Sequence, residues 1–149
     1  MSHQSPNNLH TYHYREISVG MKKEHDYVIT PEVYEHFLAA FRDVSPVHVD
    51  ENFAKSRGFS GKVMHGSLLN GFLSHFVGVY FPGRFSLLLP IDLRYSSPAY
   101  LGDTIHLEAK VSQKLDSRNV IVLDIILTNS TRGQLAARGR IQVMIKEGP

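Results

Sequence analysis

An acid and a histidine stand five residues apart across a proline: Asp43 and His48 flank Pro46. This separation is not helical, and Pro46 fixes part of the backbone between them, so a loop can direct both side chains into one pocket. A carboxylate can orient or deprotonate a water, while a histidine, with an unperturbed pKa of about 6.5, exchanges the other proton. The residues therefore predict paired acid–base chemistry. Spacing alone equally permits a turn-capping Asp43 and an ordinary surface His48.

A long apolar segment follows this pair and predicts one buried helix. Residues 65–81 contain no acid and no lysine, and their apolar positions recur at helical spacing. A second stripe along the same helix is small or polar: Ser67, Asn70, Gly71, Ser74 and Gly78. Neighbouring elements can approach such a helix closely on both sides, so it suits the interior of a fold.

The rest of the chain predicts small helices before this segment and strands after it. Thr30-Pro31-Glu32 is typical of a helix start, that helix should end near Arg42, and Asp50 can cap a short helix over residues 51–57. Extended segments are predicted at 86–97, 104–115, 120–128 and 134–146. The segment 120–128 is almost continuously apolar, which favours a central strand covered on both faces. This order predicts an α+β domain in which a curved antiparallel sheet wraps around a helix over about residues 66–81.

Composition and charge narrow the functional classes. The chain has 149 residues, 42% of them hydrophobic, and predicts a tail over residues 1–9 and a single domain over residues 10–149. Cysteine is absent, which excludes disulfides, thiolate metal sites and a cysteine nucleophile. The scattered basic residues, at a net charge of +2, give little support to nucleic-acid binding. Without a signal-like segment or a membrane-spanning run, a cytoplasmic protein that binds no membrane is expected.

Several short motifs follow one another along the chain: Asp43-x-Ser45-Pro46-x-His48, Ala54, Val63-Met64-His65-Gly66, Leu93-Arg94-Tyr95, Pro98 and Gly102-Asp103-Thr104. Their types and order resemble the hydratase-2 motif and downstream signatures of the MaoC-like (R)-specific enoyl-CoA hydratases, which have the hot-dog fold. The resemblance runs from about Tyr14 to Met144. Two positions depart from the family pattern, with Ser45 in place of the usual Asn and Arg42 in place of the usual Gly.

The resemblance implies hydration of a trans-2-enoyl thioester, or the reverse dehydration of an (R)-3-hydroxyacyl thioester, without a metal or redox cofactor. By this analogy Asp43 and His48 activate one water, with Ser45 in a supporting role, and the backbone N–H of Gly66 stabilises the enolate oxygen. Further candidates for substrate contacts are His65, Ser67 and Arg94. The expected partners are an acyl-CoA or acyl-carrier-protein thioester and further copies of the chain, in a homodimer or a higher homo-oligomer.

Two other functions stay open at this point. Hot-dog folds also host acyl-CoA thioesterases, since fold does not fix function. Thioesterases of this fold commonly carry an acid on or near the central helix, however, and residues 65–81 contain none. A non-catalytic acyl-thioester-binding protein is the second alternative, should Ser45 and Arg42 disable the site.

Overall fold

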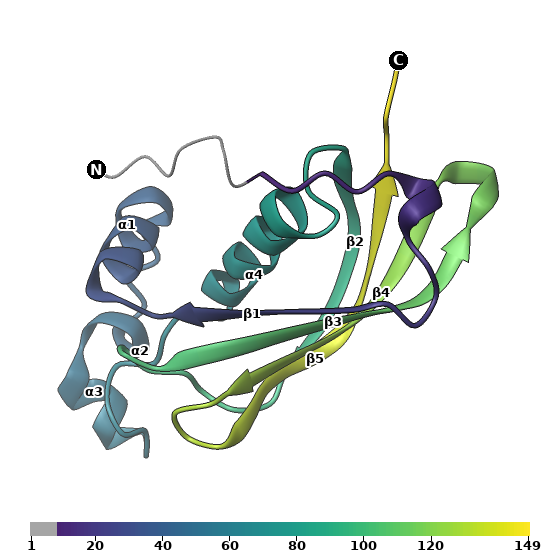
Figure 1. The fold of residues 1–149 in the computed structure, drawn as a ribbon. Coiled ribbons are helices and arrows are strands. Elements are labelled where there is room, and N and C mark those ends of the chain that lie inside the picture. Colours follow the sequence, from purple (N-terminus) through teal and green to yellow (C-terminus); the bar gives the residue numbers. More distant parts are fainter. Residues whose placement is uncertain (1–8) are drawn as a thin grey trace.

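The computed structural model describes residues 9–149, and within them five antiparallel strands form one sheet that curves around helix α4, Gly66–His75 (Figure 1). The strand order across the sheet is β1-β3-β4-β5-β2. The strands are β1 Lys22–Val28, β2 Ser86–Tyr95, β3 Thr104–Leu115, β4 Val120–Asn129 and β5 Gln134–Ile145. The predicted hot-dog architecture is confirmed. Of the predicted tail over residues 1–9, only Leu9 lies within the described residues.

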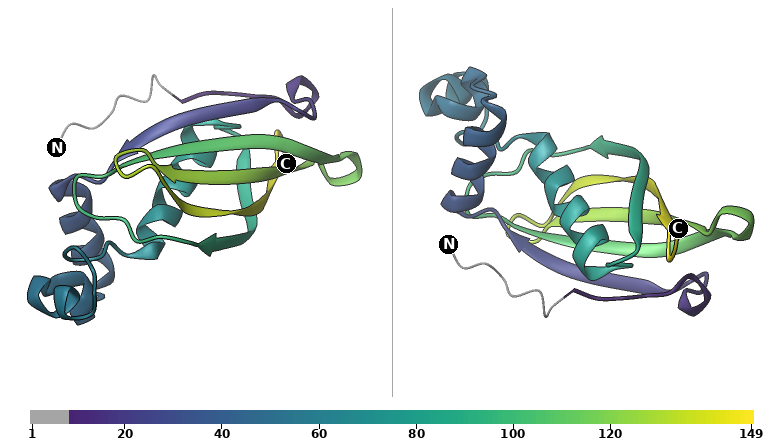
Figure 2. Two further views of the ribbon diagram at one scale, coloured as in Figure 1. Left: turned by 90° about the horizontal axis from the view of Figure 1, so that it is seen from below. Right: turned by 90° about the horizontal axis from the view of Figure 1, so that it is seen from above.

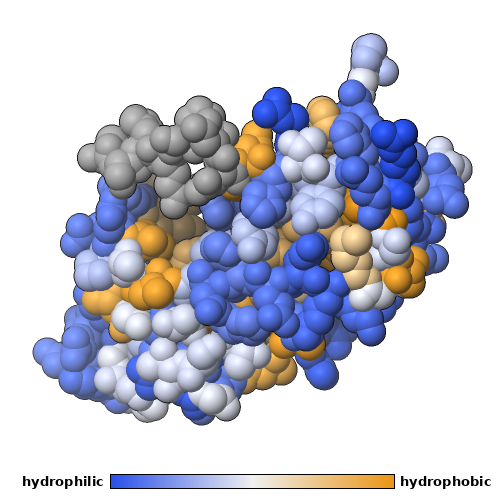
Figure 3. Space-filling view, in the orientation of Figure 1, coloured by the Kyte–Doolittle hydropathy of each residue, from blue (hydrophilic) through white to orange (hydrophobic). Residues whose placement is uncertain are grey.

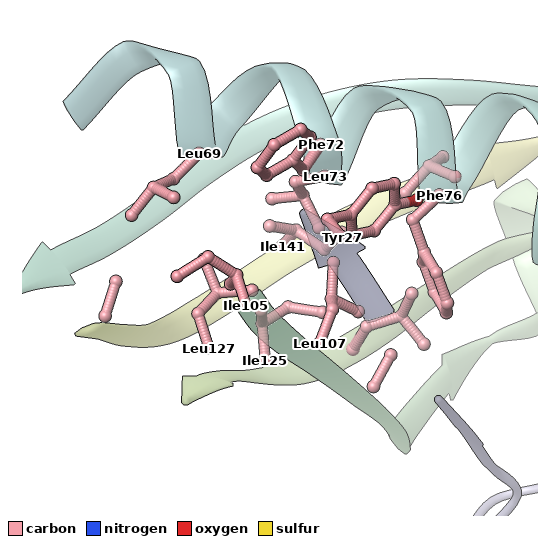
Figure 4. Close-up of a cluster of buried hydrophobic side chains, with 14 of the residues drawn as sticks. Tyr27, Leu69, Phe72, Leu73, Phe76, Ile105, Leu107, Ile125, Leu127 and Ile141 are labelled. Atoms are coloured by element: carbon pink, nitrogen blue, oxygen red, sulfur yellow. The ribbon is translucent and has the colours of Figure 1, made fainter. Parts of the chain in front are cut away.

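The core lies between α4 and the concave face of the sheet (Figures 2 and 4). Alternate residues of β3, among them Ile105 and Leu107, are fully buried, as the polar–apolar alternation predicts. From the helix, Leu73 and the following Phe76 are fully buried as well. Burying one such side chain stabilises the fold by about 1.5–3 kcal/mol, so this packing holds α4 firmly in place.

The predicted helix over residues 66–81 is divided into two parts. After α4 the chain continues as η3, a π-helical turn over Phe76–Tyr80, in which the Phe81 N–H bonds to the Phe76 carbonyl at 2.8 Å. Both phenylalanines are fully buried. The wider turn therefore ends the helix within the core.

Helices α1, α2 and α3 gather at one end of the sheet, beside the start of α4 (Figure 2). As predicted, α1 Pro31–Phe41 begins after the cap Thr30, and α3 Glu51–Ser56 is capped by Asp50, whose Oδ1 accepts from the Phe53 N–H at 2.9 Å. The loop predicted around His48 is wrong, because Pro46–Val49 forms a short helix, α2. Proline at the first helical position loses no intrahelical hydrogen bond there, so Pro46 starts this turn.

The outer face of the sheet is only partly covered. The inward side chains of β4 are buried, but Ile126 on its other face is 42% exposed, so the cover predicted on both faces is missing there. Figure 3 also shows hydrophobic surface beside α1, where Phe41 is 70% exposed. None of the helices in residues 9–149 has the length and apolar character needed to cross a bilayer.

Candidate active site

His48 has its imidazole held in a defined orientation. Its Nδ1 lies 2.7 Å from the carbonyl oxygen of Val63. Because a carbonyl only accepts, Nδ1 carries the hydrogen, and in the neutral ring Nε2 is left with a free lone pair. Nε2 lies 3.9 Å from Oδ2 of Asp43. The ring therefore presents its basic nitrogen to the carboxylate.

Asp43 is held by a local turn. Its Oδ1 accepts a hydrogen bond from the backbone N–H of Ser45 at 3.2 Å, and its side chain is 54% exposed. Ser45, predicted to support the pair, thus contacts Asp43 through its backbone. The second oxygen, Oδ2, is left to face His48. The separation of 3.9 Å is too long for a direct hydrogen bond. A water about 2.8 Å from both atoms would bridge them.

Gly66 begins α4 beside this pair. The first N–H groups of a helix have no intrahelical partner and carry partial positive charge. His65, at the N-cap position, makes no capping hydrogen bond through its side chain. A Cβ at Gly66 would lie 3.2 Å from the ring of Tyr95, so glycine allows this ring to pack on the helix start. His48, Gly66 and Tyr95 all line one cavity of about 370 Å³.

Tyr95 also connects the sheet to α4. Its hydroxyl donates to Oδ1 of Asn70 at 2.9 Å. Burial raises the pKa of Tyr95, while the hydrogen bond to Asn70 acts in the opposite direction. The hydroxyl therefore stays protonated at neutral pH and remains a donor. This bond fixes the ring that forms part of the wall beside Gly66.

A second, more apolar cavity of about 600 Å³ lies on the other side of His65. Its walls come from α1, β2 and the small-residue stripe of α4: Phe37, Phe41, Leu88, Ile91, Ser67, Asn70, Gly71 and Ser74. Asp43 lines this cavity, whereas His48 lines the first, and His65 lines both. The acid and the base therefore face each other where the two cavities meet.

Comparison with known proteins places this arrangement in a family. A family model described as "MaoC like domain" matches residues 15–131. The chain belongs to the MaoC-like domain family. An (R)-specific enoyl-CoA hydratase of Rhodospirillum rubrum is 23% identical over 141 residues, covering 95% of this chain and 96% of the relative. That of Aeromonas caviae is 30% identical over 110 residues, covering 73% of this chain and 81% of the relative.

Solved structures of the family have the same fold. An R-hydratase from Pseudomonas aeruginosa in its unliganded form superposes with a TM-score of 0.82 at 29% identity, covering 91% of this chain and 86% of that one. The R-hydratase from Aeromonas caviae gives a TM-score of 0.81 at 26% identity, covering 88% of this chain and 98% of that one. The MaoC-like domain thus accounts for nearly the whole described chain.

The structure brings together most of the residues predicted for the site. Asp43, His48, His65 and Gly66 lie where the two cavities meet, and Ser67 lines the larger one. Ser45 lines neither cavity but donates its backbone N–H to Asp43. Arg94 lies elsewhere: it shares a separate hollow with Arg138, although its neighbour Tyr95 faces α4. Successive strand residues point to opposite faces, so Arg94 lies on the outer face of the sheet. Its role in substrate binding stays a prediction.

Some residues of the site carried no signal in the sequence. Val63 acts through its backbone carbonyl, which every residue possesses. Tyr95 belongs to a recognised motif, but its packing on Gly66 depends on how β2 crosses the start of α4. Phe37 and Phe41 fitted an ordinary apolar helix face, and they line the larger cavity only because α1 lies beside the small-residue stripe.

Three side chains of the site carry potential metal-ligand atoms. Asp43, His48 and His65 each offer one ligand atom, all within 4.8 Å of one another. The two imidazole rings are tilted by 30° with their centroids 4.0 Å apart. Nδ1 of His48 and Nε2 of His65 already bond to backbone carbonyls, so the nitrogens left to ligate an ion are Nε2 of His48 and Nδ1 of His65.

Proposed function

We propose that this MaoC-like protein is an (R)-specific enoyl-thioester hydratase that also catalyses the reverse dehydration of 3-hydroxyacyl thioesters. The observation that carries the proposal is the gap of 3.9 Å between Asp43 Oδ2 and His48 Nε2, which accommodates one water beside the open start of α4. Relatives support the same chemistry. They include the (R)-specific enoyl-CoA hydratases and a 3-hydroxybutyryl-CoA dehydratase of Methylorubrum extorquens, which is 23% identical over 114 residues.

The acid–base pair would add water across the double bond in one cycle. Nε2 of His48 accepts a proton from the water as the hydroxyl oxygen bonds to the β-carbon. The resulting imidazolium then delivers a proton to the α-carbon, so the enzyme returns to its starting state. Asp43 orients the water and stabilises the transient positive charge on His48. Donation from Nδ1 to the Val63 carbonyl keeps the ring aligned throughout.

The thioester carbonyl would bind at the start of α4. As the hydroxyl adds, negative charge develops on this oxygen, and the Gly66 N–H together with the helix dipole would stabilise it. A preorganised donor of this kind is worth about 3 kcal/mol of barrier. The mechanism needs no cofactor. The water held by Asp43 and His48 would be the nucleophile, and the Gly66 N–H would polarise the thioester carbonyl.

The two cavities suggest how a thioester would lie. With its carbonyl at Gly66, the carrier arm, either CoA or an acyl-carrier protein, would approach through the cavity of about 370 Å³. The acyl chain would enter the more apolar cavity of about 600 Å³, between Phe37, Phe41 and the small residues of α4. The α- and β-carbons would then lie at the junction, next to Asp43 and His48.

We also propose that the chain forms a homodimer or a higher homo-oligomer. β2 is an edge strand of the sheet, and Leu87 and Ile91 on it are 49% and 39% exposed. Unpaired edges and exposed apolar side chains favour association with another chain. Light scattering coupled to size-exclusion chromatography would measure the assembly, and a monomer at micromolar concentration would contradict this part.

The assay for the activity follows crotonyl-CoA and medium-chain enoyl-CoA thioesters by two signals. Loss of enoyl absorbance without release of free thiol, with the R isomer of the 3-hydroxyacyl product, is the expected result. Asp43→Asn and His48→Ala should each lower its rate by about 10²–10⁴-fold. Release of thiol would indicate a thioesterase, and binding without turnover of any chain length would indicate an acyl-thioester-binding protein.

A further inference from the structure

We propose that His65 and Tyr34 are positioning residues that hold the backbone of the acid–base pair. Each donates to the main-chain carbonyl of one member. His65 Nε2 lies 2.8 Å from the carbonyl oxygen of Asp43, and the Tyr34 hydroxyl donates to the carbonyl oxygen of His48 at 2.8 Å. Both donors are buried, at 2% and 7% exposure. The inference rests on the proposed function, because it assigns these residues a role in the same site.

The segment between Asp43 and His48 has little regular structure of its own. The only helix in it is the short α2, and Asp43 follows Arg42, which has a left-handed backbone at φ 55°. The Asp43 side chain itself is mostly exposed and has one hydrogen bond at 3.2 Å, to a neighbour on the same turn. Such a segment needs contacts from rigid elements to hold a fixed geometry. Tyr34 on α1 and His65 at the start of α4 supply these contacts.

If His65 only packed against its neighbours, its buried polar ring would make the fold less stable than an apolar ring would. Its ring lies between His48, at a centroid distance of 4.0 Å, and Phe37, at 4.8 Å. Because Nε2 donates to the Asp43 carbonyl, Nδ1 of the neutral ring is an acceptor, and this buried atom has no partner within residues 9–149. A buried polar atom without a partner loses its hydration and gains nothing in return. Phenylalanine would fill similar space without that cost, so the retained donor at Nε2 has a positional role.

The gap between acid and base is the quantity that these bonds control. A displacement of the Asp43 or His48 backbone by about 1 Å would lose the bridging geometry, and misplacements of that size lower rates by about 10²-fold. Tyr34 lines neither cavity, whereas the ring of His65 lines both. Loss of the Tyr34 bond should therefore lower kcat at nearly constant KM, while replacement of His65 should lower kcat and can also change KM.

The test combines three variants of this pair with a matched control. His65→Phe keeps a ring but removes the donor, His65→Gln restores an N–H near Nε2, and Tyr34→Phe removes only a hydroxyl. The control is Tyr27→Phe, which removes a buried hydroxyl bonded to His75 at 2.8 Å at the other end of α4. We expect kcat to fall about 10–100-fold in His65→Phe and about 3–10-fold in Tyr34→Phe, with KM nearly constant in Tyr34→Phe because Tyr34 lines neither cavity. His65→Gln should recover part of the loss, and Tyr27→Phe should keep the wild-type kcat.

A stability measurement and a spectroscopic one separate the possible outcomes. His65→Phe should keep or raise Tm while it loses activity. The Nδ1–H resonance of His48 in ¹⁵N-histidine-labelled protein should shift or broaden in His65→Phe and Tyr34→Phe but not in Tyr27→Phe. Wild-type kcat in both site variants, or an unchanged resonance, would overturn the proposal. If the wild type hydrates no thioester, the proposed function fails, and the resonance still decides whether the two residues position His48.

Discussion

Among the acid–histidine pairs of residues 9–149, Asp26–His106 and Asp43–His48 differ most clearly in their geometry. On the outer face of the sheet, Asp26 of β1 and His106 of β3 are cross-strand neighbours, and Nδ1 of His106 lies 2.6 Å from Oδ1 of Asp26. At the junction of the cavities, Asp43 and His48 are 3.9 Å apart. The first pair bonds directly and leaves no room for a water. The second leaves its basic nitrogen and one carboxylate oxygen facing a shared space.

The two pairs also differ in the groups that surround them. Next to Asp26 and His106, the ammonium of Lys22 bonds Glu24 at 3.0 Å and Glu108 at 2.6 Å, so local charges are already paired. Around Asp43 and His48, the ring is fixed by a backbone carbonyl, and an uncapped helix start lies beside it. An acid and a histidine in contact are therefore no sign of catalysis. What distinguishes the site is a gap, a fixed tautomer and an adjacent cavity.

The strongest test of this comparison substitutes both pairs in the same way. Asp43→Asn and His48→Ala should each lower kcat by about 10²–10⁴-fold, the usual contribution of a general acid or base. Asp26→Asn and His106→Ala should leave kcat and KM unchanged, because neither residue borders a cavity of the site. Enoyl absorbance measures the rates, and circular dichroism checks the fold. An equal loss in the outer pair would show that the comparison is wrong.

A smaller change would bring the Asp43–His48 pair closer to the geometry of the outer pair. Asp43→Glu adds one methylene and lets the carboxylate reach Nε2 directly, which removes the space for the water. We expect kcat to fall about 10–100-fold, since a misplacement of about 1 Å is enough for such a loss. Tm should change little, because the Asp43 side chain is 54% exposed. Activity close to wild type would mean that the gap of 3.9 Å is not what the reaction requires.

The sequence predicted most of the fold because its signals were local. Alternation in 104–115 and the cap residues Thr30 and Asp50 were each confirmed in the expected elements. The prediction was wrong at Pro46, which begins a short helix, Pro46–Val49, in place of the expected loop. It also missed the π-helical turn at Phe76–Tyr80, since apolar spacing does not distinguish it from an α-helix.

The candidate site was predictable only where side chains carry the chemistry. Asp43, His48 and Gly66 stood out by type, order and resemblance. The tautomer of His48 depends on the carbonyl of Val63, and the carbonyls of Asp43 and His48 are held by residues from two different helices. These are long-range backbone contacts, which leave no pattern in a single sequence. Arg94 was grouped with the site because of its motif, but strand alternation places it on the other face.

The backbone conformation before each acid also differs between the two pairs. Asp26 lies within the regular strand β1, whereas Asp43 follows Arg42, at φ 55° and ψ 27°, a left-handed conformation that favours glycine. Arg42→Gly should raise the free energy of unfolding by about 0.5–1 kcal/mol. The substitution relieves backbone strain in the folded state, and this gain is partly offset because glycine gives the unfolded chain more entropy. Gly102→Ala, at φ 87°, is the matched reverse and should lower stability. Urea unfolding measures the free energy of unfolding of both variants. A lower value for Arg42→Gly than for the wild type would show that the backbone before Asp43 is not strained.

The smallest effect is expected at Lys22, which pairs the charges beside the outer acid–histidine pair. Hydrogen bonds to Glu108 and Glu24 raise the pKa of Lys22. The folded state therefore favours the protonated amine, and the resulting stability is present below the unfolded pKa of about 10.5 and lost as pH rises through the higher folded value.

Lys22→Met should lower Tm slightly at neutral pH and low salt, because Glu24 and Glu108 are directly opposite in the β1–β3 register and repel each other without the lysine. Salt should reduce the difference, since it screens exposed charges, and the variant should lack the loss of stability above pH 10.5. Because these charges serve only the sheet surface, kcat should stay at the wild-type value; a change in kcat would mean that the outer pair communicates with Asp43 and His48.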